Sequence, residues 1–594
     1  MCGIIGHIKT GEKIDEELFR RMLKTVEHRG PDGEGVFISD DGKRALGHRR
    51  LSFLDLSNSG KQPMSNSETT VWVSFNGEIY NYLELREELS IGYQFITGSD
   101  TEVILAAYQA WGMGFVTRLK GMFAIALLDE KNGELHLIRD RFGIKPLYYG
   151  IKEKEVVFAS ELKAIIASQS FPKKLNKSAI SDYFVYRYIP SPKTIWEGIN
   201  KLPPANFITI DLSDLSQKTV CYWELSPSDE KADIEKLVLE TEEILKNSVK
   251  QHVRADVPIG SFLSGGYDSS ALALWLKEEG KAPGTFSIGF ENWKKSEHYY
   301  ANIVANHLGL ENKAIFATEE SLDLLKRMPE VYDEPIADIS IVPTYMVSAL
   351  ARKEVKAVFS GEGADEIFGG YTWQHDFFNK TYNKSWLQKI KNIFKPNDPI
   401  DFYAQAMAMG WFDSEELKKM LHPDLHASIP KDVHWFYRSN FRKELSPFKS
   451  IQHMDMKCFM GELVLTKVDR ASMANSLEVR VPFLDHQLFE KLFSIQENDY
   501  IDQNQTKRVL FETLKDKLPS EILERKKQGF VGPDQYYMNM DFYRKELGES
   551  NLVKHNIIRE EYIDELLQES YNWKLWKIVV FEKWFTHWVS DYKG

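Results

Sequence analysis

The stretch IGSFLSGGYDSSALALWLKEE, residues 259–279, says most about the fold. Its apolar start, Ile259–Leu263, is typical of a buried strand, and Ala271–Glu279 is typical of a helix. Between them, the glycine loop Ser264–Ser270 lets backbone N–H groups approach phosphate oxygens at the start of a helix. The loop lacks the Gly-Lys-Ser/Thr ending of an ATPase P-loop. The stretch therefore predicts a strand–loop–helix unit with a different kind of phosphate-binding loop.

The chain downstream repeats this alternation. Thr285–Phe290 is expected to be a second strand, and Val355–Phe359 a third that runs into the loop Ser360–Glu366. Strand–helix alternation predicts a doubly wound parallel sheet, with ligands at the carboxyl ends of its strands. The second loop carries Glu362 and Asp365, and carboxylate oxygen is the ligand that Mg²⁺ prefers. The C-terminal half is therefore expected to be an α/β domain with additional helices and a magnesium site.

The N-terminal region has a different texture, in which short apolar segments alternate with Gly, Pro, Asn and Asp. Many strands with few helices predict packed antiparallel sheets. The clearest helix follows Ser99, which has Glu102 three residues later, a capping-box signature. The expected strands are Val71–Phe75, Met122–Leu128, Leu135–Arg139 and Val156–Ala159, and the expected helix is Asp100–Trp111.

The length of 594 residues is too great for one ordinary core. Residues 211–232 are polar and aperiodic, which predicts a linker. From Asp233 onward apolar residues recur at helical spacing. The expected division is a first domain at 1–210, a linker at 211–232 and a second domain at 233–594.

Composition limits the classes of partner. The net charge of −12 disfavours nucleic acid, which would usually require a basic surface. The three cysteines, Cys2, Cys221 and Cys458, are too few for a disulfide framework and fit a reducing compartment. Neither a secretory signal nor an apolar run of about 18 residues is visible. We expect a cytoplasmic protein with small-molecule partners and no membrane attachment.

Cys2 is the first candidate for chemistry. If the initiator methionine is removed, the thiol and the α-amine lie on one residue, so nucleophile and base come together. The amine has an ordinary pKa of about 7.7–8.0 and can accept a proton near neutral pH. Taken alone, Cys2 is more simply explained as a small apolar residue at the start of a strand.

Further segments favour the chemical interpretation. The segments are His28–Gly33, Arg50–Ser52, Asn76–Asn81 and Gly98–Asp100. Together with Cys2 they resemble the glutaminase domain of the class II, N-terminal-nucleophile amidotransferases, in family order. That resemblance implies an αββα sandwich of antiparallel sheets.

Glutamine chemistry explains the residue types in these segments. A guanidinium binds a carboxylate in bidentate fashion, and Arg50 matches the family's residue for the glutamine α-carboxylate. Asp100 matches the residue for the α-ammonium, and Glu78 belongs to the same glutamine site. The resemblance assigns the oxyanion donors to the Asn76 side chain and the Gly77 backbone N–H. Asn-Gly is also a common hairpin turn, and the turn would present these donors.

The C-terminal loops resemble those of enzymes that split ATP into AMP and pyrophosphate, and the later segments Asp469–Asp485 and Arg525–Phe530 resemble asparagine synthetases. The resemblance implies that Asp268 and Asp365 share Mg²⁺ and that Glu362 deprotonates ammonia. It also implies that Lys507 stabilises pyrophosphate, although a lone lysine is more often solvated. The implied ATP-binding residues are Leu263, Ser264, Gly265, Gly266, Asp268, Ser269, Ser287, Ile288, Ser360 and Gly361.

The expected reaction is synthesis of asparagine from aspartate, glutamine and ATP, with ammonia carried in a closed passage from Cys2. The nearest alternative is the same machinery acting on another carboxylate, such as a uronic acid. It is raised by Tyr267, where asparagine synthetases usually have Leu, Val or Ile. An RNA-modifying enzyme and a non-catalytic relative are weaker alternatives.

Two further features remain open. Family members often form homodimers, so a homodimer is possible here. The resemblance also excludes an insert near Asp376–Ser446, whose lysines lie beside Trp386, Ile390 and Phe394. Such a basic amphipathic helix is more often a solvated face than a membrane-surface element.

Overall fold

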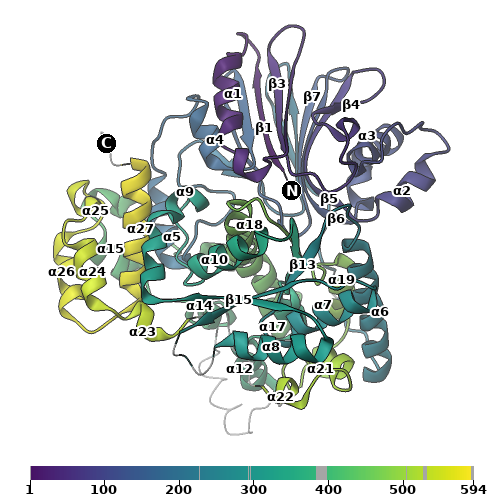
Figure 1. Cartoon of the computed structure of the whole chain (residues 1–594). Helices are drawn as coiled ribbons and strands as arrows, with labels where there is room; N and C mark the ends of the chain where they lie inside the picture. Colours follow the sequence, from purple (N-terminus) through teal and green to yellow (C-terminus); the bar gives the residue numbers. More distant parts are fainter. Residues whose placement is uncertain are drawn as a thin grey trace.

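A computed structural model describes residues 2–226, 228–291, 293, 296–382, 398–502, 505–525 and 532–589. An antiparallel sandwich formed by the N-terminal part stands on a larger α/β body formed by the C-terminal part (Figure 1). The fold expected from the sequence, with two domains of these types, is confirmed.

The first sheet of the sandwich carries the N-terminal strand at an inner position. Its strand order is β10-β8-β9-β1-β3-β2, and the neighbouring strands are antiparallel. β1 pairs with β3 so that Gly3 lies opposite Arg49, which brings Cys2 next to the end of β3. The strands are β1 (Gly3–Lys9), β2 (Gly33–Ile38), β3 (Arg44–Arg50), β8 (Tyr148–Lys152), β9 (Glu155–Ala159) and β10 (Ile199–Lys201).

The second sheet is also six-stranded and antiparallel, in the order β12-β11-β7-β6-β5-β4. Its strands are β4 (Met64–Ser65), β5 (Val71–Ile79), β6 (Gly121–Asp129), β7 (Glu134–Arg139), β11 (Asn206–Asp211) and β12 (Gln217–Cys221). β12 lies inside the segment expected to be a linker, so the N-terminal sheet continues to Cys221. The segment is polar because β12 is an edge strand with mostly exposed side chains, and such a strand carries little apolar pattern.

The two sheets pack face to face over an apolar core. Alternate residues of each strand point inward, as Ile4 and Ile8 do from β1 and Ala124 and Ala126 do from β6. Helices α1 (Glu16–Lys24) and α4 (Leu162–Ala167) cover the first sheet, while α2 (Tyr82–Leu89) and α3 (Asp100–Trp111) cover the second (Figure 1). The result is the αββα sandwich that the resemblance implied.

Helix α3 begins and ends where the sequence predicts. The hydroxyl of Ser99 accepts a hydrogen bond from the Thr101 N–H at 3.2 Å and caps the helix. The expected capping box is incomplete, because the Glu102 carboxylate accepts from the Ile96 and Thr97 N–H groups and not from Ser99. Glu102 therefore fixes the loop that leads into the helix.

The C-terminal sheet has five parallel strands in the order β15-β14-β13-β16-β17. Its order reverses direction between β13 and β16, so the loops after these two strands meet at the carboxyl edge. Helices α10 and α18 pack on one face, and α7 and α8 on the other (Figure 1). The strands are β13 (Ile259–Phe262), β14 (Thr285–Phe290), β15 (Asn312–Ala317), β16 (Ala357–Phe359) and β17 (Glu478–Arg480). The helices are α6 (Ile234–His252), α7 (Tyr267–Glu278), α8 (Glu297–Leu308), α10 (Ile341–Arg352) and α18 (Leu465–Met473).

One helix of the N-terminal part packs against the C-terminal part. This helix, α5 (Lys177–Tyr186), lies in the lower body of Figure 1. Its Tyr183 hydroxyl donates to the Lys577 carbonyl at 2.8 Å, on α27 (Trp573–Val589). The Tyr186 hydroxyl donates to the Val433 carbonyl at 2.7 Å. Residues 177–190 therefore belong spatially to the C-terminal body.

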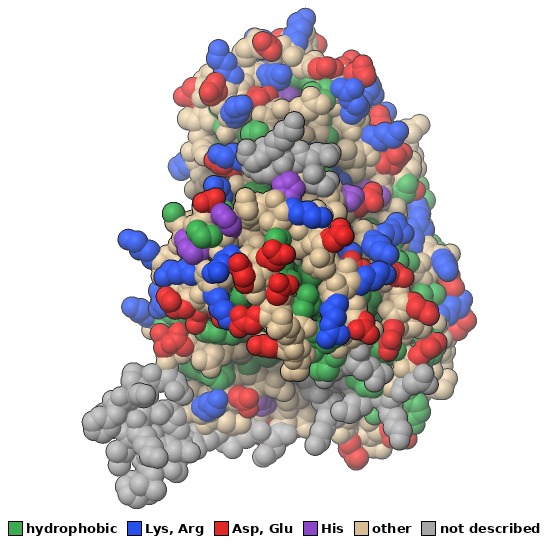
Figure 2. All heavy atoms as spheres, turned by 90° about the vertical axis from the view of Figure 1, so that its left-hand side faces the viewer, with side chains coloured by type: hydrophobic (Ala, Val, Ile, Leu, Met, Phe, Trp, Pro, Cys, Tyr) green, Lys and Arg blue, Asp and Glu red, His purple; other side chains and the backbone are tan. Residues whose placement is uncertain are grey.

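The described part of the insert is helical, with α12 (Thr372–Tyr382), α14 (Pro399–Met407), α15 (Ser414–Met420) and α16 (Trp435–Asn440). The basic helix expected around Trp386, Ile390 and Phe394, and most of the Arg525–Phe530 motif, lie outside the described residues. Across the face that carries α15, α24 (Met540–Leu547) and α26 (Glu560–Gln568), acidic and basic side chains are interspersed (Figure 2). Within the described ranges, no helix is both long and apolar enough to cross a membrane.

Candidate active sites

Cys2 is buried where β1 begins. Its backbone nitrogen donates to the Asn76 side-chain oxygen at 2.9 Å, which ties β1 to β5 of the other sheet. Burial raises the pKa of the Cys2 thiol, whereas the Leu51 backbone N–H and the Arg50 charge lower it. Thiolate formation at neutral pH therefore requires a nearby base, which is the role that the sequence assigns to the α-amine.

The Asn76 side chain has an unused donor. Its Nδ2 is buried and has no hydrogen-bond partner among the residues that the structure describes. Leaving a buried N–H unpaired costs about 1–3 kcal/mol, so such a group points to a ligand. The donor lies on the residue whose oxygen holds Cys2. This geometry suits an oxyanion that forms at the thiol.

The expected Asn-Gly hairpin turn is absent from this position. Asn76 and Gly77 lie within β5, paired with Ala124 and Phe123 of β6. A side chain at Gly77 would meet the Met122 carbonyl oxygen at 2.0 Å, so only glycine permits this close strand approach. Tertiary pairing therefore determines the conformation here, and the turn propensity of Asn-Gly does not.

Arg50 and Asp100 come from different elements, the end of β3 and the start of α3. The Arg50 guanidinium is held by the carbonyl oxygens of the following loop, at 2.9 Å from Ser57 and 3.2 Å from Leu54. Asp100 is buried at the start of α3, and its carboxylate accepts from the Ile79 N–H at 3.0 Å. Burial raises the pKa of Asp100 to about 6.

Glu78 faces the other half of the chain. Its carboxylate lies 3.5 Å from the Arg480 guanidinium on β17, and both side chains are buried. Burial raises the pKa of Glu78 well above its usual range, although the Arg480 charge opposes this shift. The side chain of this expected glutamine-binding residue thus contacts the C-terminal sheet.

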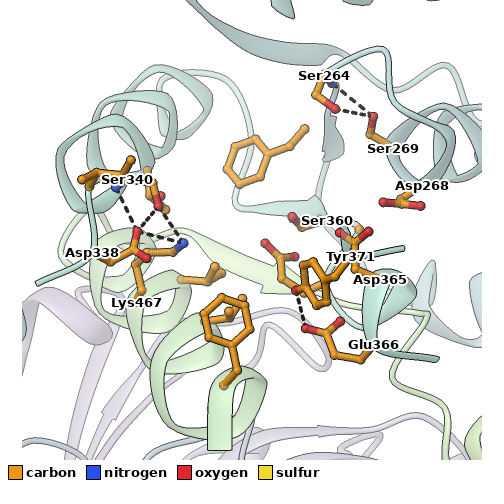
Figure 3. A pocket seen from close by; sticks show the side chains of 18 of the residues that line it. Ser264, Asp268, Ser269, Asp338, Ser340, Ser360, Asp365, Glu366, Tyr371 and Lys467 are labelled. Carbon is orange, nitrogen blue, oxygen red and sulfur yellow. Dashed lines mark hydrogen bonds and ion pairs between the residues drawn. The ribbon is translucent and has the colours of Figure 1, made fainter. Parts of the chain in front are cut away.

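A cavity of about 600 Å³ lies at the carboxyl edge of the parallel sheet (Figure 3). It contains most of the residues expected to bind ATP, whereas Gly265, Gly266 and Lys507 lie outside its lining. The expected site residues that line it are Leu263, Ser264, Asp268, Ser269, Ser287, Ile288, Ser360, Gly361, Glu362 and Asp365.

The first loop has the compact form that a phosphate site requires. Gly265 has a φ of +71°, and a side chain there would meet Tyr300 Cβ at 2.4 Å. The Ser269 hydroxyl lies 3.1 Å from both the backbone nitrogen and the hydroxyl of Ser264, which closes the loop over the start of α7. The N-terminus of α7 then favours negative charge at this end of the cavity.

Two carboxylates converge on Lys507 beneath this loop. The Lys507 Nζ lies 2.5 Å from Asp268 and 2.7 Å from Asp365. Lys507 is buried, yet the two carboxylates raise its pKa above its usual range, against the effect of burial. Asp268 and Asp365 are therefore close enough to share a cation.

Glu362 lines the same cavity. Burial raises the pKa of its carboxyl group, whereas the Lys467 charge lowers it. Its Oε2 is buried and has no hydrogen-bond partner within the described ranges.

A polar cluster that the sequence did not predict lies at the far end of this cavity. Arg187, Asp338, Ser340 and Lys467 line it, and they come from three separate segments of the chain. The nearest motif to Lys467 starts at Asp469, and no motif marked the other three residues. Only the tertiary structure brings them together.

A buried ionic network joins the two halves between the sites. Arg29 lies 2.8 Å from both Glu161 and Asp469, and Arg470 lies 3.0 Å from Glu161. These side chains are almost fully buried, so each charge depends on its partners. Both expected motifs, His28–Gly33 and Asp469–Asp485, contribute to it.

Comparisons with known proteins agree with this two-site geometry. The family model described as asparagine synthase matches residues 240–586, and the model described as glutamine amidotransferase domain matches residues 1–223. Asparagine synthetase [glutamine-hydrolyzing] 1 of Bacillus subtilis is 34% identical over 98% of this chain and 96% of its own length. Putative asparagine synthetase [glutamine-hydrolyzing] 2 of Methanocaldococcus jannaschii is 35% identical over 81% of this chain and 100% of its own length. The chain belongs to the glutamine-hydrolysing asparagine synthetase family.

Proposed function

We propose that this chain is a glutamine-hydrolysing asparagine synthase. It hydrolyses glutamine at Cys2 and transfers the ammonia to aspartate activated as its AMP ester, giving asparagine, glutamate, AMP and pyrophosphate. The observation that carries the proposal is the pairing of two sites in one chain. The buried Cys2 with the unpaired Asn76 amide forms one, and the nucleotide-type cavity at the edge of the parallel sheet forms the other.

In the glutaminase half, the free α-amine of Cys2 takes the thiol proton once the initiator methionine is removed. The thiolate attacks the glutamine side-chain amide, and the Asn76 Nδ2 with the Gly77 N–H receives the oxyanion. The C–N bond breaks, ammonia leaves with the proton, and water hydrolyses the thioester to glutamate. Arg50 binds the glutamine α-carboxylate, and Asp100 its α-ammonium, with Glu78 in the same site.

In the synthetase half, the aspartate side-chain carboxylate attacks the α-phosphorus of ATP and displaces pyrophosphate. Lys507 neutralises charge on the departing phosphates. Ammonia then adds to the activated carbonyl, Glu362 accepts its excess proton, and AMP leaves. Ammonia would protonate in bulk water, so we propose a closed passage between the sites.

Mg²⁺ belongs to this proposal, and the residues fit it. Mg²⁺ in nucleotide sites is usually held by one or two carboxylates together with phosphate oxygens. Asp268 and Asp365 supply two carboxylates close enough to share one Lys507 ammonium. The ion would neutralise phosphate charge there.

The uronic acid alternative rested on Tyr267, and the position of that side chain weakens it. The Tyr267 hydroxyl donates to the Leu523 carbonyl at 2.6 Å. Tyr267 is not among the described residues that line the cavity. Its departure from the usual family residue therefore leaves the acceptor pocket unchanged.

The remaining expectations form part of the same proposal. The chain has a first domain whose sheet extends past residue 210 to Cys221 and a second domain from residue 233 to 594. It works in the cytoplasm on small molecules, and a homodimer is possible. Sparse cysteines and the acidic net charge of −12 support the location and the absence of a nucleic-acid partner.

One assay tests the reaction. Purified protein with glutamine, ATP and Mg²⁺ should form asparagine, AMP and pyrophosphate in equal amounts only when aspartate is added. If folded protein releases glutamate but forms no asparagine or AMP, the glutaminase activity is supported and aspartate is excluded as the acceptor.

A further inference from the structure

The synthetase cavity has an end that the nucleotide chemistry leaves unused. In Figure 3, Asp338, Ser340 and Lys467 lie across the cavity from Ser264 and Asp268. The phosphate loop and the acidic pair occupy one end, so ATP phosphates belong there. Phosphate binding therefore does not explain the charged cluster that lines the opposite end.

Asp338 is buried at this end and remains charged. Its Oδ1 accepts from the Ser340 N–H at 2.9 Å and from the Ser340 hydroxyl, and it lies 3.5 Å from the Lys467 Nζ. Burial favours the neutral acid, but the Lys467 and Arg187 charges outweigh it and lower the pKa of Asp338. All these contacts use Oδ1, so Oδ2 can accept from a ligand.

Arg187 supplies a second cation near Asp338. Its guanidinium lies over the Phe459 ring, 5.8 Å from the ring centroid, and its charge lowers the pKa of Asp338. Within the described ranges no carboxylate forms a direct ion pair with it, and its buried Nε has no hydrogen-bond partner. The residue has a φ of +73° at the end of α5, a position that favours Gly or Asn. An arginine is costly in this backbone conformation, so its side chain is expected to serve a ligand.

We propose that Arg187, Lys467 and Asp338 form the acceptor's recognition site, which takes the α-carboxylate and α-ammonium of an amino dicarboxylic acid. Arg187, with Lys467, binds the carboxylate that is not amidated, and the free oxygen of Asp338 binds the ammonium. The other carboxylate then points toward Glu362 and the ATP phosphates. This assignment rests on the proposed synthase activity and specifies its substrate class.

The charge pattern discriminates against a uronic acid. Such a sugar has one carboxylate, which the reaction itself consumes, and no ammonium. It would leave the Arg187 guanidinium and the second oxygen of Asp338 against uncharged hydroxyls, and burying charged groups against neutral partners is costly. A site built for an amino dicarboxylate therefore rejects it by leaving its own charges unsatisfied.

Both halves of the chain build this site. Arg187 follows α5 in the N-terminal part, and its carbonyl oxygen accepts from the Ala337 N–H at 2.8 Å. That contact joins Arg187 to the segment that carries Asp338 and Ser340. Lys467, from α18, completes the cluster from the C-terminal part.

Steady-state kinetics on full-length variants test the assignment. Arg187→Met should raise the KM for aspartate by about 10- to 100-fold, the loss expected when a charge-assisted contact is removed. The KM values for ATP and glutamine, and the glutaminase rate, should not change. Lys177→Met is the matched control, because it removes an exposed cation from the first residue of the same helix.

Competitors separate recognition from a general structural effect. Succinate has both carboxylates without the ammonium, and β-alanine has the ammonium with one carboxylate. Arg187→Met should weaken inhibition by succinate and leave β-alanine unchanged, while Asp338→Asn should do the reverse. Equal weakening of both competitors, together with a changed KM for ATP, would overturn the assignment.

The outcomes also separate this inference from the proposed function. Wild-type enzyme that makes no asparagine from aspartate would overturn the proposed function itself. Wild-type synthesis with an unchanged aspartate KM in Arg187→Met would overturn only the recognition site. If Arg187→Met does not yield folded protein, Arg187→Gln carries the same test, and an unchanged KM there has the same meaning.

Discussion

The guanidinium of Arg480 lies 3.5 Å from the carboxylate of Glu78, across the boundary between the sandwich and the parallel sheet. The backbone oxygen of Arg480 also accepts from the Ser360 N–H at 2.9 Å, at the edge of the ATP-type cavity. One residue thus contacts a strand of the glutaminase site and a loop of the synthetase site. If either site moves, Arg480 must transmit the movement to the other site, or its contact with Glu78 or with Ser360 must break.

Arg480→Met should destabilise the protein strongly. The substitution removes the buried cation that contacts both Glu78 and Glu478, and breaking a buried pair costs about 3–5 kcal/mol. Denaturant unfolding measures the change. Arg20→Met is the control, since its exposed pair with Glu16 should contribute no more than about 1 kcal/mol. Equal losses in the two variants would contradict the structural role of Arg480.

Cys2→Ser should separate the two half-reactions. A serine hydroxyl is a weaker nucleophile than a thiol, so glutamine-dependent synthesis should fall to background. Synthesis from added ammonium salt should continue at the wild-type rate, because the cavity at the parallel sheet is unchanged. The measurement is the rate of asparagine formation by the variant and the wild type, with glutamine and with ammonium as nitrogen donor. Loss of the ammonia-dependent reaction as well would mean that Cys2 supports the fold of both halves.

Glutamine binding should weaken at acid pH through Asp100. Burial raises the pKa of this carboxyl to about 6, so it is ionised above pH 6 and protonated below. Only the ionised form attracts the glutamine ammonium, and the Kd should rise about tenfold per pH unit below 6. Calorimetry with the Cys2→Ser variant between pH 5 and 8 avoids turnover. A Kd that stays constant from pH 7 to pH 5 would exclude Asp100 from this role, and Asp100→Asn should abolish the dependence.

Lys507→Met should slow adenylation without affecting the glutaminase. The lysine is the buried cation between Asp268 and Asp365, and losing one preorganised charge at the reacting phosphates costs about 10²–10³ in rate. Exchange of labelled pyrophosphate into ATP, in the presence of aspartate, reports this step. Lys507 immediately precedes helix α21 (Arg508–Leu514), and Lys515 immediately follows it. Lys515→Met, which changes an exposed lysine, should exchange at the wild-type rate. Normal exchange in Lys507→Met would remove the lysine from the mechanism.

Local chemistry made part of this molecule predictable. The capped helix Asp100–Trp111 and the strand Thr285–Phe290 occur as expected, because caps and apolar periods act over a few residues. The loop Ser264–Ser270 was recognisable because glycine backbone geometry is itself the phosphate-binding device.

Features that depend on tertiary pairing were not predictable. Asn76-Gly77 became part of a strand because β6 pairs along its length, and β12 was hidden by its exposed, polar side chains. Arg187 and Lys467 are 280 positions apart in the sequence, and only helix packing brings them to one cavity. The Glu78–Arg480 contact likewise has no sequence signal, since either residue alone reads as a surface charge.

The position of α5 affects how such enzymes can be recombined. If the arginine that follows this helix recognises the acceptor, then grafting a foreign glutaminase module onto residues 233–594 also imports that module's residue at this point. The glutaminase domain would then help to determine substrate preference, together with the domain that activates the acid. A junction after residue 190 replaces Arg187, whereas a junction before α5 keeps it. The two chimaeras should therefore differ in selectivity.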